Sequence, residues 1–270
     1  MRCKLLAGGV VMACGLPASA MASPVNTERM ASAVDTEGWS ATLDAKGGYR
    51  DGNVDKINAS FSGGLQYETF HPSAEGAPNF LRDRWLLATN VVFVNFNGND
   101  VTDSGFMHTR YTRMVRPRIG AETFLQAQYN AFTRLRSRML YGLGARVDAV
   151  HRPAFRLWGG SGYMLEYEIN ATADGDPHPA ETFNHRWTSY VTAEGSLVDG
   201  QLRLRNTAYV QPRLDDFGDL RLLDSAQIEA AVGKVFALGI DFELQFDSRP
   251  PAGIARRDVQ LGSYLRLRFG

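Results

Sequence analysis

The histidines and the serines near them are the first residues to examine for catalytic chemistry. The chain has five histidines, His71, His108, His151, His178 and His185. The nearest approach to a Ser/His arrangement is His185 with Ser189, four residues further on. On a strand this spacing places both side chains on one face but about 13 Å apart, whereas direct proton transfer requires hydrogen-bond distance. The sequence therefore displays no Ser/His/acid constellation, and we expect no enzyme.

Metal and disulfide chemistry also lack the residues they need. Both cysteines, Cys3 and Cys14, lie within the first 22 residues, and no His/Cys cluster has zinc spacing. Asp174 and Asp176 flank a glycine but are not followed by the further ligands of a calcium loop. We expect no metal and no other cofactor.

Charged side chains at alternate positions are the remaining chemically informative pattern. These polar positions carry His108, Arg110, Arg138, Arg146, Glu166, Glu168, Arg186, Asp241, Glu243, Arg266 and Arg268, together with Asp44, Lys46, Lys56, Glu122, Glu194, Arg203, Arg205, Arg221 and Glu229. Opposite signs fall on neighbouring segments, and opposite charges facing each other across two strands stabilise a sheet. We expect Asp241 and Glu243 beside Arg266 and Arg268, and ring closure to bring Asp44 and Lys46 to the other side.

The elements that position these charges have a period of two, which is typical of strands with one apolar and one polar face. In the segment 238–246 every second residue is large and apolar. We predict twelve such strands, at 39–50, 54–69, 84–96, 105–115, 119–130, 136–148, 155–169, 185–195, 201–211, 219–232, 237–247 and 258–269. The chain is therefore expected to be all-β and a single domain.

The lengths of strands and connectors favour a transmembrane barrel over a soluble sandwich or a soluble barrel. Most of the segments are about 10–14 residues long, whereas soluble strands most often have five or six and a tilted transmembrane strand needs about 9–11. If residue 39 lies on the periplasmic side, the turns at 115–118, 195–200 and 233–237 are periplasmic and short, and those at 97–104, 170–184, 211–218 and 247–257 are outer and longer. The long connector at 70–83 violates this rule. The sequence predicts a single antiparallel up-and-down barrel of about twelve strands, with the charged set above as its lumen-lining candidates.

Aromatic residues and the end of the chain agree with this interpretation. Aromatics stand near segment ends, as girdles at lipid–water interfaces do: Trp39, Tyr49, Tyr67, Trp85, Tyr129, Trp187, Tyr209 and Phe269. Leu265, Leu267 and Phe269 alternate up to a terminal aromatic and resemble the insertion signal of bacterial outer-membrane barrels. Gly270 departs from that pattern, which ordinarily ends on the aromatic.

The N-terminus predicts export. Arg2 and Lys4 precede a short apolar stretch, and small residues offer cleavage sites after Ala20 or Ala22, so residues 1–22 have the pattern of a signal peptide. A weaker alternative makes Cys14 a lipidation site. Residues 23–38 are expected to be a short polar lead-in and 39–270 the barrel domain.

Charge and hydropathy exclude two broad classes of protein. Lys plus Arg and Asp plus Glu each number 29, so there is no basic field for a nucleic acid. Beyond the N-terminus no apolar run reaches about 18 residues, which excludes a helical membrane protein.

Several stretches together resemble a known family. They are 106–113, 122–130, 134–138 with 142–144, 162–168, 209–212 and 247–251. In order and spacing they are similar to domain-of-unknown-function family 481 (DUF481), the YdiY-like proteins described as salt-induced outer-membrane proteins. The resemblance covers roughly residues 39–269 and implies an outer-membrane barrel without an assigned activity or catalytic residues.

Three functions are compatible with such a barrel. The leading hypothesis is a passive or weakly selective pore for small polar or ionic solutes in the outer membrane of a Gram-negative bacterium. The alternative is a plugged structural barrel, or one whose outer loops bind a partner, and an outer-wall lipid hydrolase is the weakest. The expected partners are outer-membrane lipid and, during insertion, the barrel-assembly machinery; the oligomeric state is left open. An open charged lumen would favour the pore, and full neutralisation of its charges would favour the plugged barrel.

Overall fold

The computed structural model describes residues 25–30, 37–50, 56–72, 80–96, 99–131, 133–172 and 175–269. The predicted signal peptide, with Cys14, lies outside these residues, as do residues 23–24 and 31–36 of the lead-in. Within the described residues no helix is both long and apolar enough to cross a membrane.

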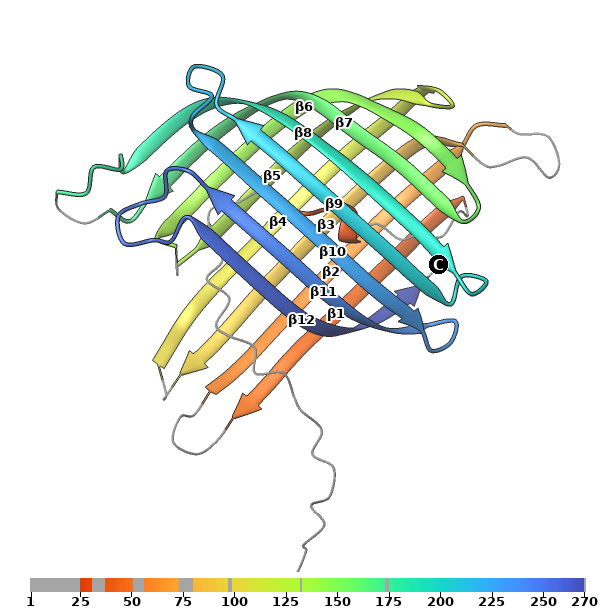
Figure 1. The fold of residues 1–270 in the computed structure, drawn as a ribbon, viewed down its shortest axis with the longest axis horizontal. Helices are drawn as coiled ribbons and strands as arrows, with labels where there is room; N and C mark the ends of the chain where they lie inside the picture. Colours follow the sequence, from red (N-terminus) through yellow and green to blue (C-terminus); the bar gives the residue numbers. More distant parts are fainter. Residues whose placement is uncertain are drawn as a thin grey trace, which may run out of the picture.

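Twelve antiparallel strands form a closed barrel in which each strand pairs with its neighbours in sequence, and β1 closes the ring against β12 (Figure 1). The strands are β1 (Gly38–Arg50), β2 (Lys56–Phe70), β3 (Leu81–Phe96), β4 (Asn99–Arg116), β5 (Ile119–Asn130), β6 (Leu135–Arg152), β7 (Phe155–Asn170), β8 (Glu181–Leu197), β9 (Leu202–Pro212), β10 (Leu220–Ala231), β11 (Phe236–Asp247) and β12 (Arg257–Phe269). The predicted all-β, up-and-down, twelve-stranded architecture is confirmed.

Most predicted strand bounds agree with the structure, but the prediction of one long connector was wrong. The strand predicted at 105–115 begins at Asn99, so the long outer connector expected at 97–104 does not exist. Polar residues in this stretch resemble a turn, but residues 99–106 pair with β3 and continue the sheet. The connector between β2 and β3, by contrast, is long, as expected for the exception to the alternation rule.

The two ends of the barrel differ. We call the end where β1 begins and β12 finishes the terminal end, and the opposite end the loop end. Long connectors at 171–180, 213–219 and 248–256 gather at the loop end, whereas most connectors at the terminal end are short.

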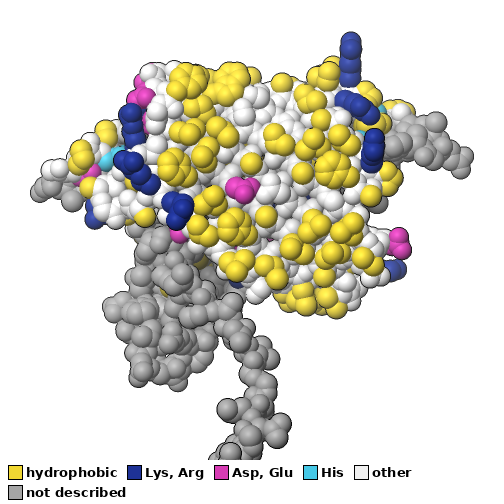
Figure 2. Space-filling model, viewed as in Figure 1, with side chains coloured by type: hydrophobic (Ala, Val, Ile, Leu, Met, Phe, Trp, Pro, Cys, Tyr) yellow, Lys and Arg dark blue, Asp and Glu magenta, His cyan; other side chains and the backbone are white. Residues whose placement is uncertain are grey.

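The wall has an apolar outside and a polar inside. Along β11, Leu238 and Ile240 are exposed by 55% and 54%, whereas the alternating Asp241 is 2% exposed. Figure 2 shows the resulting belt of hydrophobic side chains over the face of the barrel in view. Soluble monomers rarely expose contiguous apolar patches beyond a few hundred Å². The polarity of this wall is therefore that of a transmembrane barrel.

Two aromatic residues do not lie where the girdle pattern placed them. Trp187 faces outward but lies well inside β8 instead of near its end. Tyr209 is 4% exposed and stacks on Tyr190 inside the barrel, with ring centroids 5.3 Å apart. Trp39 and Tyr67, in contrast, lie on the outer surface near the terminal end with ring centroids 5.1 Å apart. Tyr209 belongs to the polar alternation of β9, and that alternation decides its direction.

Candidate functional site

The interior of the barrel holds a short segment that is not part of the wall. Residues 25–30, which include the 3-10 turn η1 (Glu28–Met30), lie within the ring of strands (Figure 1). We call these residues the luminal segment. Asn26, Thr27 and Glu28 are all at most 3% exposed. Part of the predicted lead-in therefore occupies the lumen.

Glu28 anchors the luminal segment to three strands. Its Oε1 accepts a hydrogen bond from Arg110 Nη1 of β4 at 2.8 Å, and its Oε2 accepts one from Trp158 Nε1 of β7 at 3.0 Å. Arg146 Nη1 of β6 lies 3.7 Å from Oε1. One carboxylate thus joins a separate piece of chain to strands that are far apart in sequence.

Glu122 and Tyr190 complete this arrangement. Tyr190 donates to Glu122 Oε2 at 3.0 Å and accepts from Arg146 Nη1 at 2.8 Å. The Arg110 guanidinium carbon lies 5.3 Å from the centroid of the Tyr190 ring, a cation–π distance. We define the central cluster as Glu28, Arg110, Glu122, Arg146, Trp158 and Tyr190.

Further contacts attach the luminal segment to the strands that close the ring. Thr42 Oγ1 of β1 donates to the carbonyl of Met30 at 3.2 Å, and Arg266 Nη2 of β12 donates to the carbonyl of Arg29 at 3.1 Å. Arg29 Nη1 also lies 3.9 Å from Glu243 Oε2 of β11. The segment therefore bridges opposite sides of the barrel.

The surroundings of Glu28 keep its carboxyl group ionised. Burial by itself raises the pKa of this group, but the guanidinium groups of Arg146, Arg110 and Arg84 outweigh burial and lower the pKa to about 2. A carboxylate that is buried but paired in this way is retained, whereas an unpaired one would be expelled or neutralised.

A second group of buried charges, the loop-end cluster, lies near the ends of β6, β7, β8, β10 and β11. It consists of Arg138, Arg186, Arg221, Glu166, Glu168, Asp219 and Asp247. Arg221 Nη1 donates to Glu168 Oε1 at 2.9 Å and its Nε donates to Asp247 Oδ2 at 3.0 Å. Because Arg221 is on β10 and Glu168 on β7, this contact reaches across strands that are not neighbours.

Arg186 and Arg138 extend the loop-end cluster. Arg186 Nε donates to Glu166 Oε1 at 2.8 Å, and its Nη2 donates to Asp219 Oδ1 at 2.9 Å. Arg138 pairs with Glu168, which is directly opposite it in the register of β6 and β7. Arg138 and Arg186 are each 1% exposed, so the cluster is closed to solvent.

At the terminal end, charges pair differently from the expectation. Arg266 donates to Asp44 at 2.7 Å and lies 2.9 Å from Glu229 Oε2. Arg268 also pairs with Glu229. The expected position of Asp241 and Glu243 beside these two arginines was wrong, because the register sets Arg266 opposite Ala237 and Asp241 opposite Gly262.

Ring closure pairs the two other charges of this region. Lys46 Nζ of β1 donates to Asp241 Oδ1 at 2.6 Å, across β12. The expectation that ring closure brings Asp44 and Lys46 to β12 and β11 therefore agrees with the structure. Asp44 pairs with Arg266 of β12, and Lys46 pairs with Asp241 of β11.

His108 lies in the interior beside a small cavity. It is 2% exposed, its Nδ1 is 2.9 Å from Gln126 Oε1, and its ring stacks on Phe124. The cavity has a volume of about 30 Å³ and is lined in part by Arg110, Glu122 and Tyr209. This space suits a water molecule rather than a solute.

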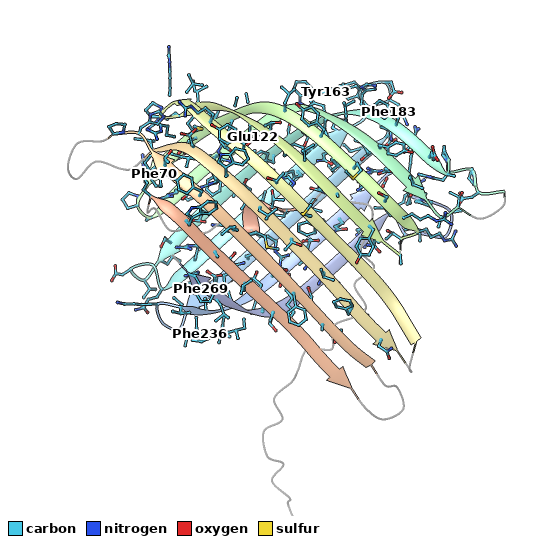
Figure 3. All side chains as sticks on the ribbon, turned by 180° about the vertical axis from the view of Figure 1, so that it is seen from behind. Phe70, Glu122, Tyr163, Phe183, Phe236 and Phe269 are labelled. Atoms are coloured by element: carbon cyan, nitrogen blue, oxygen red, sulfur yellow. The ribbon has the colours of Figure 1, made fainter. Side chains whose placement is uncertain are left out.

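Aromatic rings fill much of the remaining interior. Gly142 of β6 lies so close to the Phe124 ring that a Cβ there would collide with it, and Gly239 of β11 is covered by Tyr264 in the same way. A side chain at either position would force the ring to move, because the ring occupies the space of a Cβ. Figure 3 shows side chains crossing the space between the strands, with Glu122 among them.

The terminal strand carries the predicted insertion signal on the outside. Leu265 and Phe269 are 41% and 49% exposed, and β12 pairs through Leu265, Leu267 and Phe269 with residues 41–45 of β1. Recognition of this strand by an assembly machinery stays a prediction.

The serine and histidine considered for hydrolysis face outward and contact other residues. His185 Nδ1 is hydrogen-bonded to the Tyr163 hydroxyl, and Ser189 Oγ lies 2.8 Å from Ser161 Oγ. Within the described part of the chain, no group of three or more His, Cys, Asp or Glu residues could hold a metal ion.

Sequence reasoning missed several interior residues. Glu28 and Trp158 of the central cluster and Asp219 and Asp247 of the loop-end cluster were not among the candidates. Asp219 and Asp247 adjoin predicted connectors and resemble turn residues, and Glu28 stands in a segment without periodicity. Trp158 could have been found from the sequence, because the period of two along β7 places its side chain on the inner face of the barrel.

These features define the class of the protein, a transmembrane β-barrel with a filled, charge-paired lumen. The chain belongs to the family described as "Protein of unknown function, DUF481", whose sequence model matches residues 78–269. The resemblance found in the sequence is therefore confirmed over most of its extent.

Among solved structures, the chain is similar to the NanC porin, with 10% identity, 84% of this chain and 98% of that chain covered, and a TM-score of 0.44. It is also similar to the translocator domain of the autotransporter NalP from Neisseria meningitidis, with 12% identity, 87% and 89% covered, and a TM-score of 0.43. A third is the KdgM porin in complex with disordered oligogalacturonate, with 8% identity, 85% and 99% covered, and a TM-score of 0.43. None of the curated proteins matches the chain.

Proposed function

We propose that this protein is an outer-membrane barrel that is closed to passive diffusion and acts through its outer loops rather than by conducting solutes. The observation that carries the proposal is the luminal segment, held in the interior by Glu28 and enclosed by two further sets of ion pairs. The plugged, partner-binding alternative is therefore favoured over the open pore. The charged lumen-lining candidates act in this proposal as links among the strands and between the strands and the luminal segment.

The outer-membrane location is supported by three features of the chain. The barrel is apolar outside, its connectors are longer at the loop end, and the first 22 residues have the pattern of an export signal. Closed barrels are the one β architecture that crosses a bilayer without unpaired strand edges. In this orientation the terminal end faces the periplasm and the loop end faces the exterior.

The connectors at the loop end form an ordered surface. Arg249 Nη2 contacts Asp216 Oδ2 at 2.6 Å, and the backbone N–H of Ala252 donates to Asp176 at 3.4 Å, so three connectors are joined. The backbone N–H of Gly218 and the Arg249 guanidinium lower the pKa of Asp216. Phe217, next to Asp216, is 68% exposed. An exposed aromatic on a loop ordered before binding is a feature of partner-binding surfaces.

Single-channel recording in a planar bilayer tests the proposal. The refolded chain lacking residues 1–22 is first checked for heat-modifiable migration on a gel, which reports a folded barrel. We expect a heat-modifiable protein that gives no discrete current steps. Regular current steps from the same heat-modifiable species would overturn the closed barrel and establish the pore. Absence of heat-modifiable migration would contradict the membrane barrel itself.

A further inference from the structure

The outer wall carries a polar patch within its apolar belt. Five residues that point outward from adjoining strands form this patch, which we call the mid-wall patch: Ser161 of β7, Trp187 and Ser189 of β8, Asn206 of β9 and Asp224 of β10. On the face formed by the later strands, Figure 2 shows acidic surface surrounded by hydrophobic side chains.

The polar atoms of the mid-wall patch are bonded in two groups, Asn206 with Asp224 and the two serines with Trp187. Asn206 Nδ2 donates to Asp224 Oδ1 at 2.7 Å. Trp187 Nε1 donates to Ser161 Oγ at 2.9 Å, and Ser161 Oγ lies 2.8 Å from Ser189 Oγ. These bonds satisfy only part of the capacity of the patch. A carboxylate accepts up to about four hydrogen bonds, and an amide donates two.

The depth of the patch makes it costly in lipid. Asp224 lies four residues from Leu220 and seven from Ala231, and each of the other members lies at least four residues from both ends of its strand. Four tilted strand residues span about 10 Å of the bilayer normal, so these groups lie within the hydrocarbon region. Among the described side chains, Asp224 is the one charged group that faces outward this far from both strand ends.

Small residues adjoin the acidic half of the patch on β8, β9 and β10, whereas Leu244 of β11 faces Asp224 from the other side. The register sets Asn206 opposite Ala193 and Ala226, and Asp224 opposite Ala208. With methyl groups opposite Asn206 on both sides and opposite Asp224 on β9, another flat wall can approach the amide and the carboxylate from the β9 side. Polar groups next to small residues are typical of surfaces that associate inside a membrane.

We infer that a second copy of this chain docks on the mid-wall patch about a two-fold axis that runs along the bilayer normal between β9 and β10. Membrane insertion gives both copies the same orientation, so this axis brings groups of equal depth together. It also places β9 of one copy against β10 of the other. An N–H of the Asn206 amide, which can donate two hydrogen bonds, then donates to Asp224 of the second copy, and the same bond forms twice. The patch is thus self-complementary without any cationic partner.

This inference rests on the membrane location proposed above, and reconstituted vesicles test the two separately. The chain lacking residues 1–22 is labelled with donor or acceptor dye, and energy transfer is measured as the protein-to-lipid ratio falls. We expect wild type to dimerise and the double variant Asn206→Leu/Asp224→Leu to associate at least tenfold more weakly. Thr123→Leu, an outward polar position on the opposite wall, is the matched control and should dimerise like wild type.

Disulfide trapping adds a second measurement. Ala226→Cys lies beside the axis and should form a cross-linked dimer on oxidation, whereas Ala127→Cys on β5 should not. An inserted, heat-modifiable wild type that stays monomeric at every ratio would overturn the dimer but leave the membrane barrel standing. Equal association of the double leucine variant would overturn the role of the patch. Failure of wild type to insert would overturn the membrane location and, with it, the dimer.

Discussion

The central cluster and the loop-end cluster use the same chemistry, but the first holds the luminal segment in the barrel and the second links wall strands to one another. In both, buried arginines bond to buried carboxylates at about hydrogen-bond distance. The loop-end cluster is built from wall strands and one adjoining loop residue, so it links the wall to itself. The central cluster depends on Glu28, which belongs to the luminal segment.

The difference separates two consequences of losing an ion pair. Removing one partner from a buried pair leaves an uncompensated charge, and the cost depends on what else the group can reach. In the loop-end cluster that cost must appear in the unfolding of the barrel. In the central cluster the luminal segment can detach, and the strands remain paired by their backbone hydrogen bonds.

The largest expected effect follows loss of Arg221, because this residue contacts Glu166, Glu168 and Asp247 together. Arg221→Ala should lower the free energy of unfolding by about 3–5 kcal/mol, the usual cost of breaking a buried charge pair. Urea unfolding in detergent, followed by gel mobility, measures it. Arg136→Ala, an exposed arginine at the same end of the barrel, is the control and should stay within about 0.5 kcal/mol of wild type. Equal stability of the two variants would contradict the role of the cluster.

Loss of Glu28 should have a smaller effect on stability and a distinct effect on access. Glu28→Ala is expected to cost about 1–3 kcal/mol, the price of hydrogen bonds to charged groups. Because Trp158 donates to Glu28, detachment of the luminal segment should expose its indole to an aqueous quencher. Acrylamide quenching of tryptophan fluorescence measures this access, with Trp158→Phe identifying the signal. Unchanged quenching in Glu28→Ala would show that the segment is held without its carboxylate.

Acid should release the same segment only at very low pH. The pKa of Glu28 is lowered from 4.5 to about 2, so folding favours the ionised form. Its contribution is complete above pH 4.5 and is lost as the pH falls through about 2. Quenching of Trp158 should therefore stay constant down to about pH 4 and rise near pH 2. In Glu28→Gln this rise should be absent; an identical acid transition in that variant would assign it to other groups.

The smallest effect is expected at the loop surface. Arg249 is 53% exposed where it contacts Asp216, and exposed ion pairs contribute little to stability. Arg249→Ala should therefore leave the midpoint of urea unfolding unchanged while loosening the connectors around Phe217, which limited proteolysis detects. A shift of the midpoint as large as that of Arg221→Ala would abolish the distinction between buried and exposed pairs.

Strand prediction succeeded where alternation was uninterrupted and failed where pairing overrode composition. β5 occupies residues 119–130, as predicted, because every second residue there is apolar or small. β4 begins six residues before its predicted start, because its polar first residues are held by pairing with β3. The strand that contains Tyr209 was predicted correctly, but the placement of this residue in an aromatic girdle was wrong, because the alternation of β9 turns its ring inward.

The period-two pattern of this chain determined by itself that it forms strands, which face of each is polar, and how many there are. Those properties depend on neighbours along the chain, because successive strand residues point to opposite sides. Which charges meet depended on the tertiary structure. Glu28 reaches Arg110 across 82 positions, and Asp44 reaches Arg266 across 222. Such pairs are selected by closure of the ring and by the register of each strand, and neither is encoded in the local alternation of residues.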